Sequence, residues 1–182
     1  LAYMAHHDSL TGLPNRAYFF ERVHQVLKSA QRNQRRIALL FIDLEKFKVL
    51  NDLYGHAVGD LVLQEAAQRM LAAVRETDTL GRVGGDEFVA LLPDLFEESD
   101  ALRVANKISD TLKKPFRISQ IEYSLGVSIG IAFYPEHGDD ERALAKSADI
   151  AMYCAKSLLE NNICVFSSEM RERSSFRSSS PD

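Results

Sequence analysis

Two carboxylates, Asp86 and Glu87, directly follow a pair of glycines in the segment RVGGDEFVALLP (82–93). A third, Asp43, stands where the apolar run IALLFI (37–42) ends. If the two segments are neighbouring strands, the three carboxylates meet at one edge of a sheet. Oxygen ligands without histidine or cysteine suit Mg²⁺ or Mn²⁺, and Mg²⁺ held by a few carboxylates usually serves the phosphates of a substrate. Each acid taken alone is more simply a solvated loop charge, but the glycines leave room for a phosphate beside the backbone and favour the metal.

Hydrophobic periodicity predicts the elements that position these acids. The run 37–42 is continuously apolar, as expected of a strand buried on both faces. A glycine pair between two short apolar runs predicts a β-hairpin, because glycine accepts the positive φ that tight turns need. A short helix is predicted over 45–53, followed by a loop over 54–60. Further apolar spacing predicts helices near 20–30, 62–74, 102–112 and 144–155, and strands at 122–135 and 163–166. The sequence thus predicts one α/β (α+β) domain with a central mixed β-sheet surrounded by helices.

Length and composition exclude several classes of protein. The chain has 182 residues, 46% of them hydrophobic, which is enough for one core. A net charge of −4 argues against nucleic acid as a partner. No apolar run approaches the roughly 18 residues of a membrane span, and no signal peptide opens the chain. We expect a cytoplasmic domain, or the cytoplasmic part of a membrane-anchored protein, in which Cys154 and Cys164 are reduced. The chain begins at Leu1 rather than methionine, which indicates a fragment of a longer protein.

The segment GGDEF at 84–88 is the name-giving motif of the GGDEF family, the diguanylate cyclases. Other segments resemble the remaining blocks of this family, in the same order: DSLTGLPNR (8–16), FIDLEKFKVLND (41–52), YGHAVGD (54–60), SIGIAFYPEHG (128–138) and ADIAMYCAK (148–156). On these motifs the chain is identified as a member of the family over residues 8–166. The resemblance implies a fold like the catalytic core of nucleotidyl cyclases. It also implies a bacterial signalling enzyme that joins two GTP into cyclic di-GMP, releases pyrophosphate, and works as a homodimer with one GTP in each protomer.

The resemblance assigns the catalytic residues and the metal ligands. Asp43 and Asp86 would hold Mg²⁺ (or Mn²⁺) through their side chains, with the carbonyl of Leu44 helping. Asp86 or Glu87 would assist deprotonation of the attacking 3′-hydroxyl, and the sequence does not separate the two. Lys48 would meet phosphate charge.

The resemblance also assigns the residues that would bind GTP, which are Asn51, His56, Asp60, Gly84, Gly85 and Lys156. Asn51 and Asp60 would read the guanine edge, because a carboxylate accepts from two N–H groups of guanine. His56 would frame the nucleotide, and Lys156 would reach the terminal phosphates. A simpler interpretation exists for each residue, such as a helix stop for Asn51. Their joint appearance in the order of the family favours binding.

The segment RETD (75–78) suggests regulation by the product. In the family, an R-x-x-D placed five residues before GGDEF is the product-inhibition site, and Arg75 and Asp78 have that spacing. Arg75 would grip cyclic di-GMP with its fork of donors. The alternative is an ordinary charged helix end, because R-x-x-D is a common pattern.

Leu159 and Glu160 depart from the family pattern. They stand where the family has glycine and an arginine that supports the triphosphate. A carboxylate within a few ångströms of a phosphate costs roughly 1 kcal/mol in water and more where solvent is excluded. Unless this turn points outward, Glu160 favours a second hypothesis. In it the domain is catalytically weak or inactive, binds GTP or cyclic di-GMP, and regulates a neighbouring phosphodiesterase (EAL) domain.

We expect three parts along the chain. Residues 1–7 are an incoming linker or helix end, residues 8–167 are the GGDEF domain, and residues 168–182 are an exit linker with a disordered serine-rich tail. The segment FSSEMRERSSF (166–176) resembles the exit from a GGDEF domain into an EAL domain in hybrid proteins. A sensor domain upstream is also expected.

Overall fold

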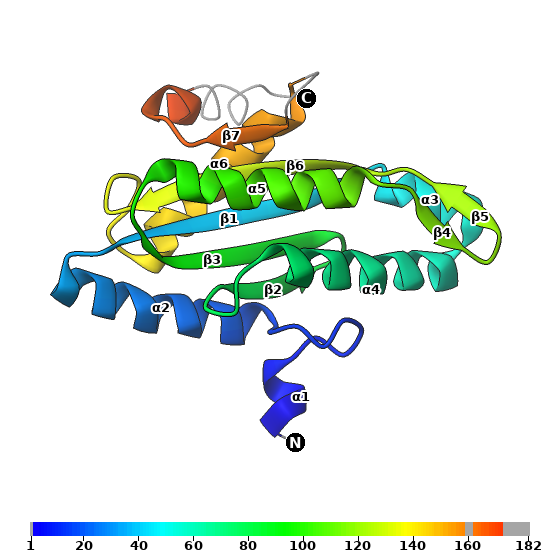
Figure 1. Ribbon diagram of the computed structural model, residues 1–182, viewed down its shortest axis with the longest axis horizontal. Helices are drawn as coiled ribbons and strands as arrows, with labels where there is room; N and C mark the ends of the chain where they lie inside the picture. Colours follow the sequence, from blue (N-terminus) through cyan, green and yellow to red (C-terminus); the bar gives the residue numbers. More distant parts are fainter. Residues whose placement is uncertain (1, 159–161, 173–182) are drawn as a thin grey trace, which may run out of the picture.

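A five-stranded mixed sheet forms the centre of the protein (Figure 1). The computed structural model describes residues 2–158 and 162–172. The strands of the central sheet are β1 (Arg36–Glu45), β2 (Thr79–Gly84), β3 (Glu87–Leu95), β6 (Gly126–Tyr134) and β7 (Ile163–Val165). They lie in the order β2-β3-β1-β6-β7, antiparallel except for the parallel pair β6 and β7. A separate two-stranded sheet consists of β4 (Phe116–Ile118) and β5 (Ile121–Tyr123).

Helices cover both faces of the central sheet, as predicted. The covering helices are α2 (Arg16–Asn33), α3 (Phe47–Tyr54), α4 (His56–Ala73), α5 (Glu98–Lys113) and α6 (Glu141–Lys156), and a short helix α1 (Ala2–His6) precedes them. One hydrophobic cluster packs α3, α4 and α5 against one face of the sheet, and a second packs α2 and α6 against the other. In Figure 1, α4 and α5 lie in front of the sheet and α6 lies behind it.

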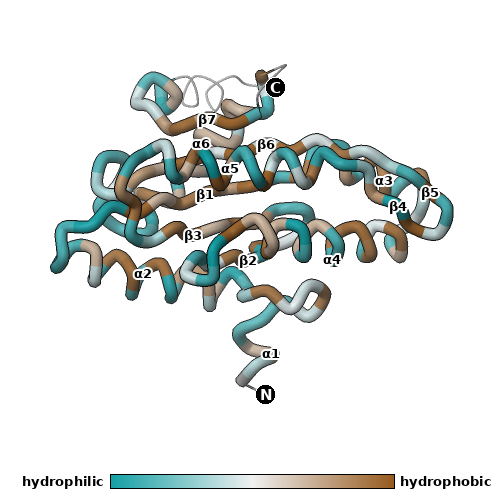
Figure 2. Tube along the Cα trace, in the orientation of Figure 1, coloured by the Kyte–Doolittle hydropathy of each residue, from teal (hydrophilic) through white to brown (hydrophobic). Residues whose placement is uncertain are grey.

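Strand β1 contributes to both clusters. Leu40 and Ile42 face α4 and α5, while Ile37 and Leu39 face α2 and α6, because side chains alternate along a strand. This double burial explains the continuous apolar run, which Figure 2 shows as a brown stretch along the central strands. The same alternation sends Asp43 to the face that α2 and α6 cover.

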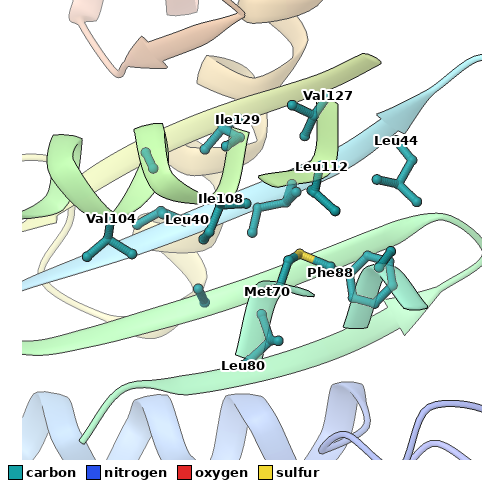
Figure 3. Packing of buried hydrophobic residues seen from close by; sticks show 14 of the residues in the cluster. Leu40, Leu44, Met70, Leu80, Phe88, Val104, Ile108, Leu112, Val127 and Ile129 are labelled. Atoms are coloured by element: carbon teal, nitrogen blue, oxygen red, sulfur yellow. The ribbon is translucent and has the colours of Figure 1, made fainter. Parts of the chain in front are cut away.

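The larger cluster lies between the sheet and the helices α4 and α5. Figure 3 shows Met70 of α4 and Leu112 of α5 directed toward Leu40 of β1 and Phe88 of β3. Leu40 and Phe88 are fully buried. This packed layer holds β1 and β3 together and so fixes the strand ends that carry the acids.

Residues 54–60, expected as a loop, are mostly helical. Helix α3 ends at Tyr54 and α4 begins at His56, so only Gly55 separates the two helices. Gly55 has a φ of +88°, which a residue with a side chain rarely adopts, and this lets the chain turn within one residue. The prediction was wrong because the two glycines of YGHAVGD suggested a loop. The consequence is that Asn51 and Asp60 lie on two adjoining helices.

Both ends of the described chain carry short helical segments. The expected incoming segment contains α1, and residues 168–172 of the expected exit linker form a helical turn. The guanidinium carbon of Arg171 lies 5.3 Å from the centre of the Phe166 ring. The remainder of the expected tail, residues 173–182, lies outside the described residues. Within the described ranges, no helix combines the length and hydrophobicity needed to cross a membrane.

Candidate active site

Three carboxylates gather where β1 meets the hairpin of β2 and β3. Asp43 pairs in register with Glu87, and the backbone N–H of Leu44 donates to the carbonyl oxygen of Asp86 at 3.2 Å. Asp43 is 6% exposed, while Asp86 and Glu87 are half-buried. The neighbouring strands that the sequence prediction required are present. They bring the three acids to one end of the sheet.

The surroundings of the hairpin raise the pKa of both Asp86 and Glu87. Burial, together with the charge and hydrogen bond of the Asp43 carboxylate, raises the pKa of Asp86 to about 6. Burial also raises the pKa of Glu87, to which Asp43 and Asp149 add their negative charge. Packing several carboxylates together makes their ionised forms less stable unless a cation is near.

Lys156, the last residue of α6, provides one such cation. Its Nζ lies 2.6 Å from Oδ2 of Asp43. Burial lowers the pKa of Lys156, but the hydrogen bond that its ammonium group donates to Asp43 and the charge of the surrounding carboxylates outweigh this, so the pKa is raised overall. The lysine expected at the terminal phosphates therefore lies against an expected metal ligand.

Replacing Lys156 with methionine should destabilise the metal-free chain. The change leaves the buried Asp43 carboxylate without its partner, and removing one partner of a buried pair costs several kcal/mol. Because the Lys156 side chain is 35% exposed, we expect a smaller loss of about 1–2 kcal/mol in the free energy of unfolding. Urea unfolding in EDTA measures this loss. Lys107→Met, at an exposed position of α5, is the matched control, and equal losses in both variants would contradict the prediction.

Asp86 should also make the stability of the chain depend on pH. Its pKa is about 6 in the folded chain, against an unperturbed value of 3.8 that applies to the unfolded chain, so protonation favours folding. This contribution is complete below about pH 4 and is lost as the pH rises through 6. In EDTA, the free energy of unfolding of the wild type should fall by an amount on the order of 1 kcal/mol between pH 4 and 7. We expect Asp86→Asn to abolish this fall. Urea unfolding across this range measures the difference, and parallel curves for the two proteins would contradict it.

The donor set suits a divalent cation. Asp43 and Asp86 offer only oxygen, and their mutual repulsion would be relieved by a positive ion between them. Within the described residues, no three histidine, cysteine or acidic side chains are grouped to hold a metal by themselves.

A second polar position lies between α3 and α4. Asn51 is on α3, and its Oδ1 is buried without a hydrogen-bond partner among the described residues. This oxygen lies over Gly59 of α4, where an added Cβ would overlap it. His56 and Asp60 are exposed and four residues apart on α4, so they share one face of the helix. A buried acceptor without a partner is costly, which is a reason to expect a ligand here.

Arg82 and Asp8, neither of which is among the residues predicted from the sequence, stabilise the hairpin turn. Arg82 donates to the Gly85 carbonyl oxygen from Nε at 2.9 Å and from Nη2 at 2.7 Å. Its Nη1 lies 2.9 Å from Oδ1 of Asp8. Gly84 and Gly85 both have positive φ, of +151° and +50°, as the predicted turn requires. The signal for this contact was the block DSLTGLPNR, whose first residue is Asp8.

The remaining predicted residues lie on other elements or outside the described chain. Lys48 is exposed on α3. Arg75 and Asp78 lie just before β2, at the opposite end of that strand from the glycines, and their side chains are 3.5 Å apart. Leu159 and Glu160 lie outside the described residues.

Comparison with known proteins places this arrangement in a family. The family profile described as "Diguanylate cyclase, GGDEF domain" matches residues 5–162. The chain is 48% identical over 157 residues to diguanylate cyclase TpbB of Pseudomonas aeruginosa, covering 86% of this chain and 36% of TpbB. It is 46% identical over 170 residues to the bifunctional diguanylate cyclase/cyclic di-GMP phosphodiesterase MucR of the same organism, covering 93% of this chain and 25% of MucR.

Solved structures agree with the sequence comparison. A structure of TpbB that comprises only the GGDEF domain superposes with a TM-score of 0.90 and 43% identity, covering 93% of this chain and 99% of that one. The family match covers strands β1, β2, β3 and β6, the hairpin and helices α2 to α6, and the superposition covers 93% of the chain. The chain therefore belongs to the diguanylate cyclase GGDEF-domain family.

Proposed function

We propose that this chain is a diguanylate cyclase, which joins two GTP into cyclic di-GMP and releases two pyrophosphates. The observation that carries the proposal is the grouping of Asp43, Asp86 and Glu87 beside Lys156 at one end of the sheet. Acids and a lysine in this arrangement suit charge neutralisation and proton transfer during phosphoryl transfer. The names of TpbB and MucR support the same activity.

Members of the family use a divalent metal ion, and Mg²⁺, with Mn²⁺ as the alternative, is the ion proposed here. Asp43 and Asp86 would hold it together with the Leu44 carbonyl, and when bound it neutralises phosphate charge. Lys156 would then move its ammonium group from Asp43 to the terminal phosphates. Asp43 would then have the metal ion as its counter-charge, and Lys156 would have the phosphates.

The proposed reaction is a substitution at the α-phosphate. The 3′-hydroxyl oxygen of one GTP forms a bond to the α-phosphorus of the other, the bond to the β-phosphate oxygen breaks, and pyrophosphate leaves. The hydroxyl proton passes to a carboxylate. Glu87 is the better acceptor, because Asp86 is engaged as a ligand and the raised pKa of Glu87 brings it closer to neutral pH.

The guanine base is proposed to bind between α3 and α4. The unpartnered Oδ1 of Asn51 would accept an N–H of guanine, and the Asp60 carboxylate would accept its neighbouring N–H groups. His56 would frame the nucleotide from the first turn of α4, and Lys48 would meet phosphate charge. Gly84 and Gly85 carry no side chain that would block the triphosphate.

Catalysis and regulation are proposed to involve partners. Two protomers would face each other about a two-fold axis, because each 3′-hydroxyl must reach the other GTP. Arg75 and Asp78 would bind cyclic di-GMP as an inhibitor, which requires Arg75 to exchange its 3.5 Å contact with Asp78 for the product. A sensor domain upstream and a phosphodiesterase domain downstream would complete the protein, and the name of MucR pairs a cyclase with a phosphodiesterase in one chain.

The test is synthesis of cyclic di-GMP by the chain fused to a dimeric coiled coil, with GTP and Mg²⁺, followed by chromatography. Product from the wild type and none from Asp86→Ala would support the proposal. GTP binding without product at high protein concentration would overturn it in favour of a regulatory domain. In that case Glu160→Arg shows whether the reversed charge at 160 is responsible, since it should raise turnover.

A further inference from the structure

The chain has two cysteines, and the fold brings them together at the β7 edge of the central sheet. Cys154 lies in the last turn of α6, and Cys164 is the middle residue of β7. Nine residues, 155–163, separate them in the sequence. Strand β7 packs against α6, and both cysteines are free thiols that are partly exposed. A small oxidant in solution therefore has access to the pair.

The alternation of side chains along β7 directs Cys164 toward α6. Cys164 packs in the cluster of α2 and α6, whereas its neighbours Ile163 and Val165 pack in the other cluster. Across the sheet, Cys164 pairs with Gly130 of β6. An added Cβ at Gly130 would overlap the backbone of α6 at Ala151. The absence of a side chain at Gly130 thus lets α6 lie directly on the sheet beside Cys164.

The two thiols are in direct contact. They are hydrogen-bonded to each other, and burial, with a further contribution from Cys154, raises the pKa of Cys164 to about 11. Cys164 is therefore protonated at neutral pH, so Cys154 is the thiol that reacts first with an oxidant. A disulfide needs two sulfur atoms that can approach to about 2.05 Å, and an adjacent pair of thiols meets this requirement with a small movement.

We propose that Cys154 and Cys164 are a modification site at which a peroxide forms a reversible disulfide. The sulfur of Cys154, after losing its proton, attacks one oxygen of hydrogen peroxide, the O–O bond breaks, and a sulfenic acid forms. The sulfur of Cys164 then displaces that oxygen as water and loses its proton. Overall, the two thiols are oxidised to a disulfide and hydrogen peroxide is reduced to water. Because the pair is partly exposed, a thiol reductant can reverse the bond.

The disulfide would fasten the last turn of α6 to β7. Lys156 follows Cys154 by two residues and ends this turn, and its Nζ lies 2.6 Å from Oδ2 of Asp43. The proposed function requires Lys156 to move from Asp43 to the phosphates, and the consequence for activity rests on that function. A bond at Cys154 holds the backbone of the same helical turn and so restricts the movement. Oxidation should therefore lower the kcat of cyclic di-GMP formation at least about fivefold.

Mass spectrometry of the chain before and after treatment with hydrogen peroxide tests the disulfide. We expect a loss of about 2 Da, a peptide that links residues 154 and 164 after digestion without reductant, and recovery of both thiols with dithiothreitol. In Cys164→Ser, the sulfenic acid on Cys154 has no partner, so dimedone should trap it there but not in the wild type. Thiols that stay reduced in peroxide, or a disulfide that joins two chains on a non-reducing gel, would overturn the proposal.

Rates of cyclic di-GMP formation by the chain fused to a dimeric coiled coil test the consequence for Lys156. The kcat should fall at least about fivefold on oxidation and return with dithiothreitol, while peroxide should not change the kcat of Cys154→Ser. Equal kcat in the oxidised and reduced wild type would overturn the restraint on Lys156. A chain that forms the disulfide but makes no cyclic di-GMP when reduced would contradict the proposed function and still support the modification site.

Discussion

Asp86→Asn should lower the kcat of cyclic di-GMP formation at least about a thousandfold, without destabilising the chain. The substitution removes a proposed metal ligand while keeping the size of the side chain, so the charge on the reacting phosphates loses its counter-charge. In the metal-free chain, Asp86 is instead a source of repulsion, because its pKa is raised to about 6 by burial and by Asp43. Asparagine keeps the shape and removes the repulsion, so the melting temperature should stay level or rise. Active-site acids are a common place for such opposition between stability and activity.

Two measurements on the same protein check this prediction. Chromatography of the reaction products gives kcat, and thermal unfolding in EDTA gives the melting temperature at pH 7. Asp110→Asn, an exposed acid on α5, is the control for a simple loss of negative charge and should change neither quantity. An Asp86→Asn protein that keeps a tenth of the wild-type activity, or that melts several degrees lower, would show that Asp86 has another role.

The central strand and the positions of Asp43 and Glu87 could be predicted, because a strand that is buried on both faces is a continuous apolar run in the sequence. The run 37–42 is apolar throughout, so the strand end at Asp43 is visible, and the glycine pair marks the hairpin that brings Glu87 beside it. Fully buried strands and glycine turns have little freedom in sequence. The roles of Asn51, Asp60 and Lys156 came from motifs shared with the family, which identify residues without showing what they contact.

Contacts between distant segments could not be predicted. The pair of Lys156 and Asp43 joins the last long helix to the first strand, and a lysine at a helix end is ordinarily a solvated charge. A charged residue on an edge strand is ordinarily solvated, and nothing in the sequence marks Arg82 as the residue that links the hairpin turn to Asp8.

Gly59→Ala should weaken GTP binding, raising KM at least about tenfold, while the fold remains intact. Gly59 is buried inside α4 and has ordinary helical backbone geometry, so alanine is acceptable to the helix and even favours it by up to about 1 kcal/mol. The added Cβ, however, would overlap Oδ1 of Asn51 and lie 3.2 Å from Cζ of Phe47. The amide of Asn51 is the end of a flexible side chain, so it should swing away and lose the position proposed for guanine. The free energy of unfolding should stay within about 1 kcal/mol of the wild type.

A double-mutant cycle distinguishes displacement of Asn51 from general damage to α4. Asn51→Ala alone should raise KM to a similar extent, because it removes the same acceptor. Gly59→Ala should then add little in the Asn51→Ala background, since the methyl group no longer meets an amide oxygen. Initial rates of cyclic di-GMP formation at increasing GTP give KM for the four proteins. Fully additive effects would mean that Gly59→Ala acts through the helix itself and not by displacing the amide of Asn51. Strong non-additivity would instead show that the absence of a side chain at residue 59 of α4 allows Asn51 of α3 to meet the nucleotide.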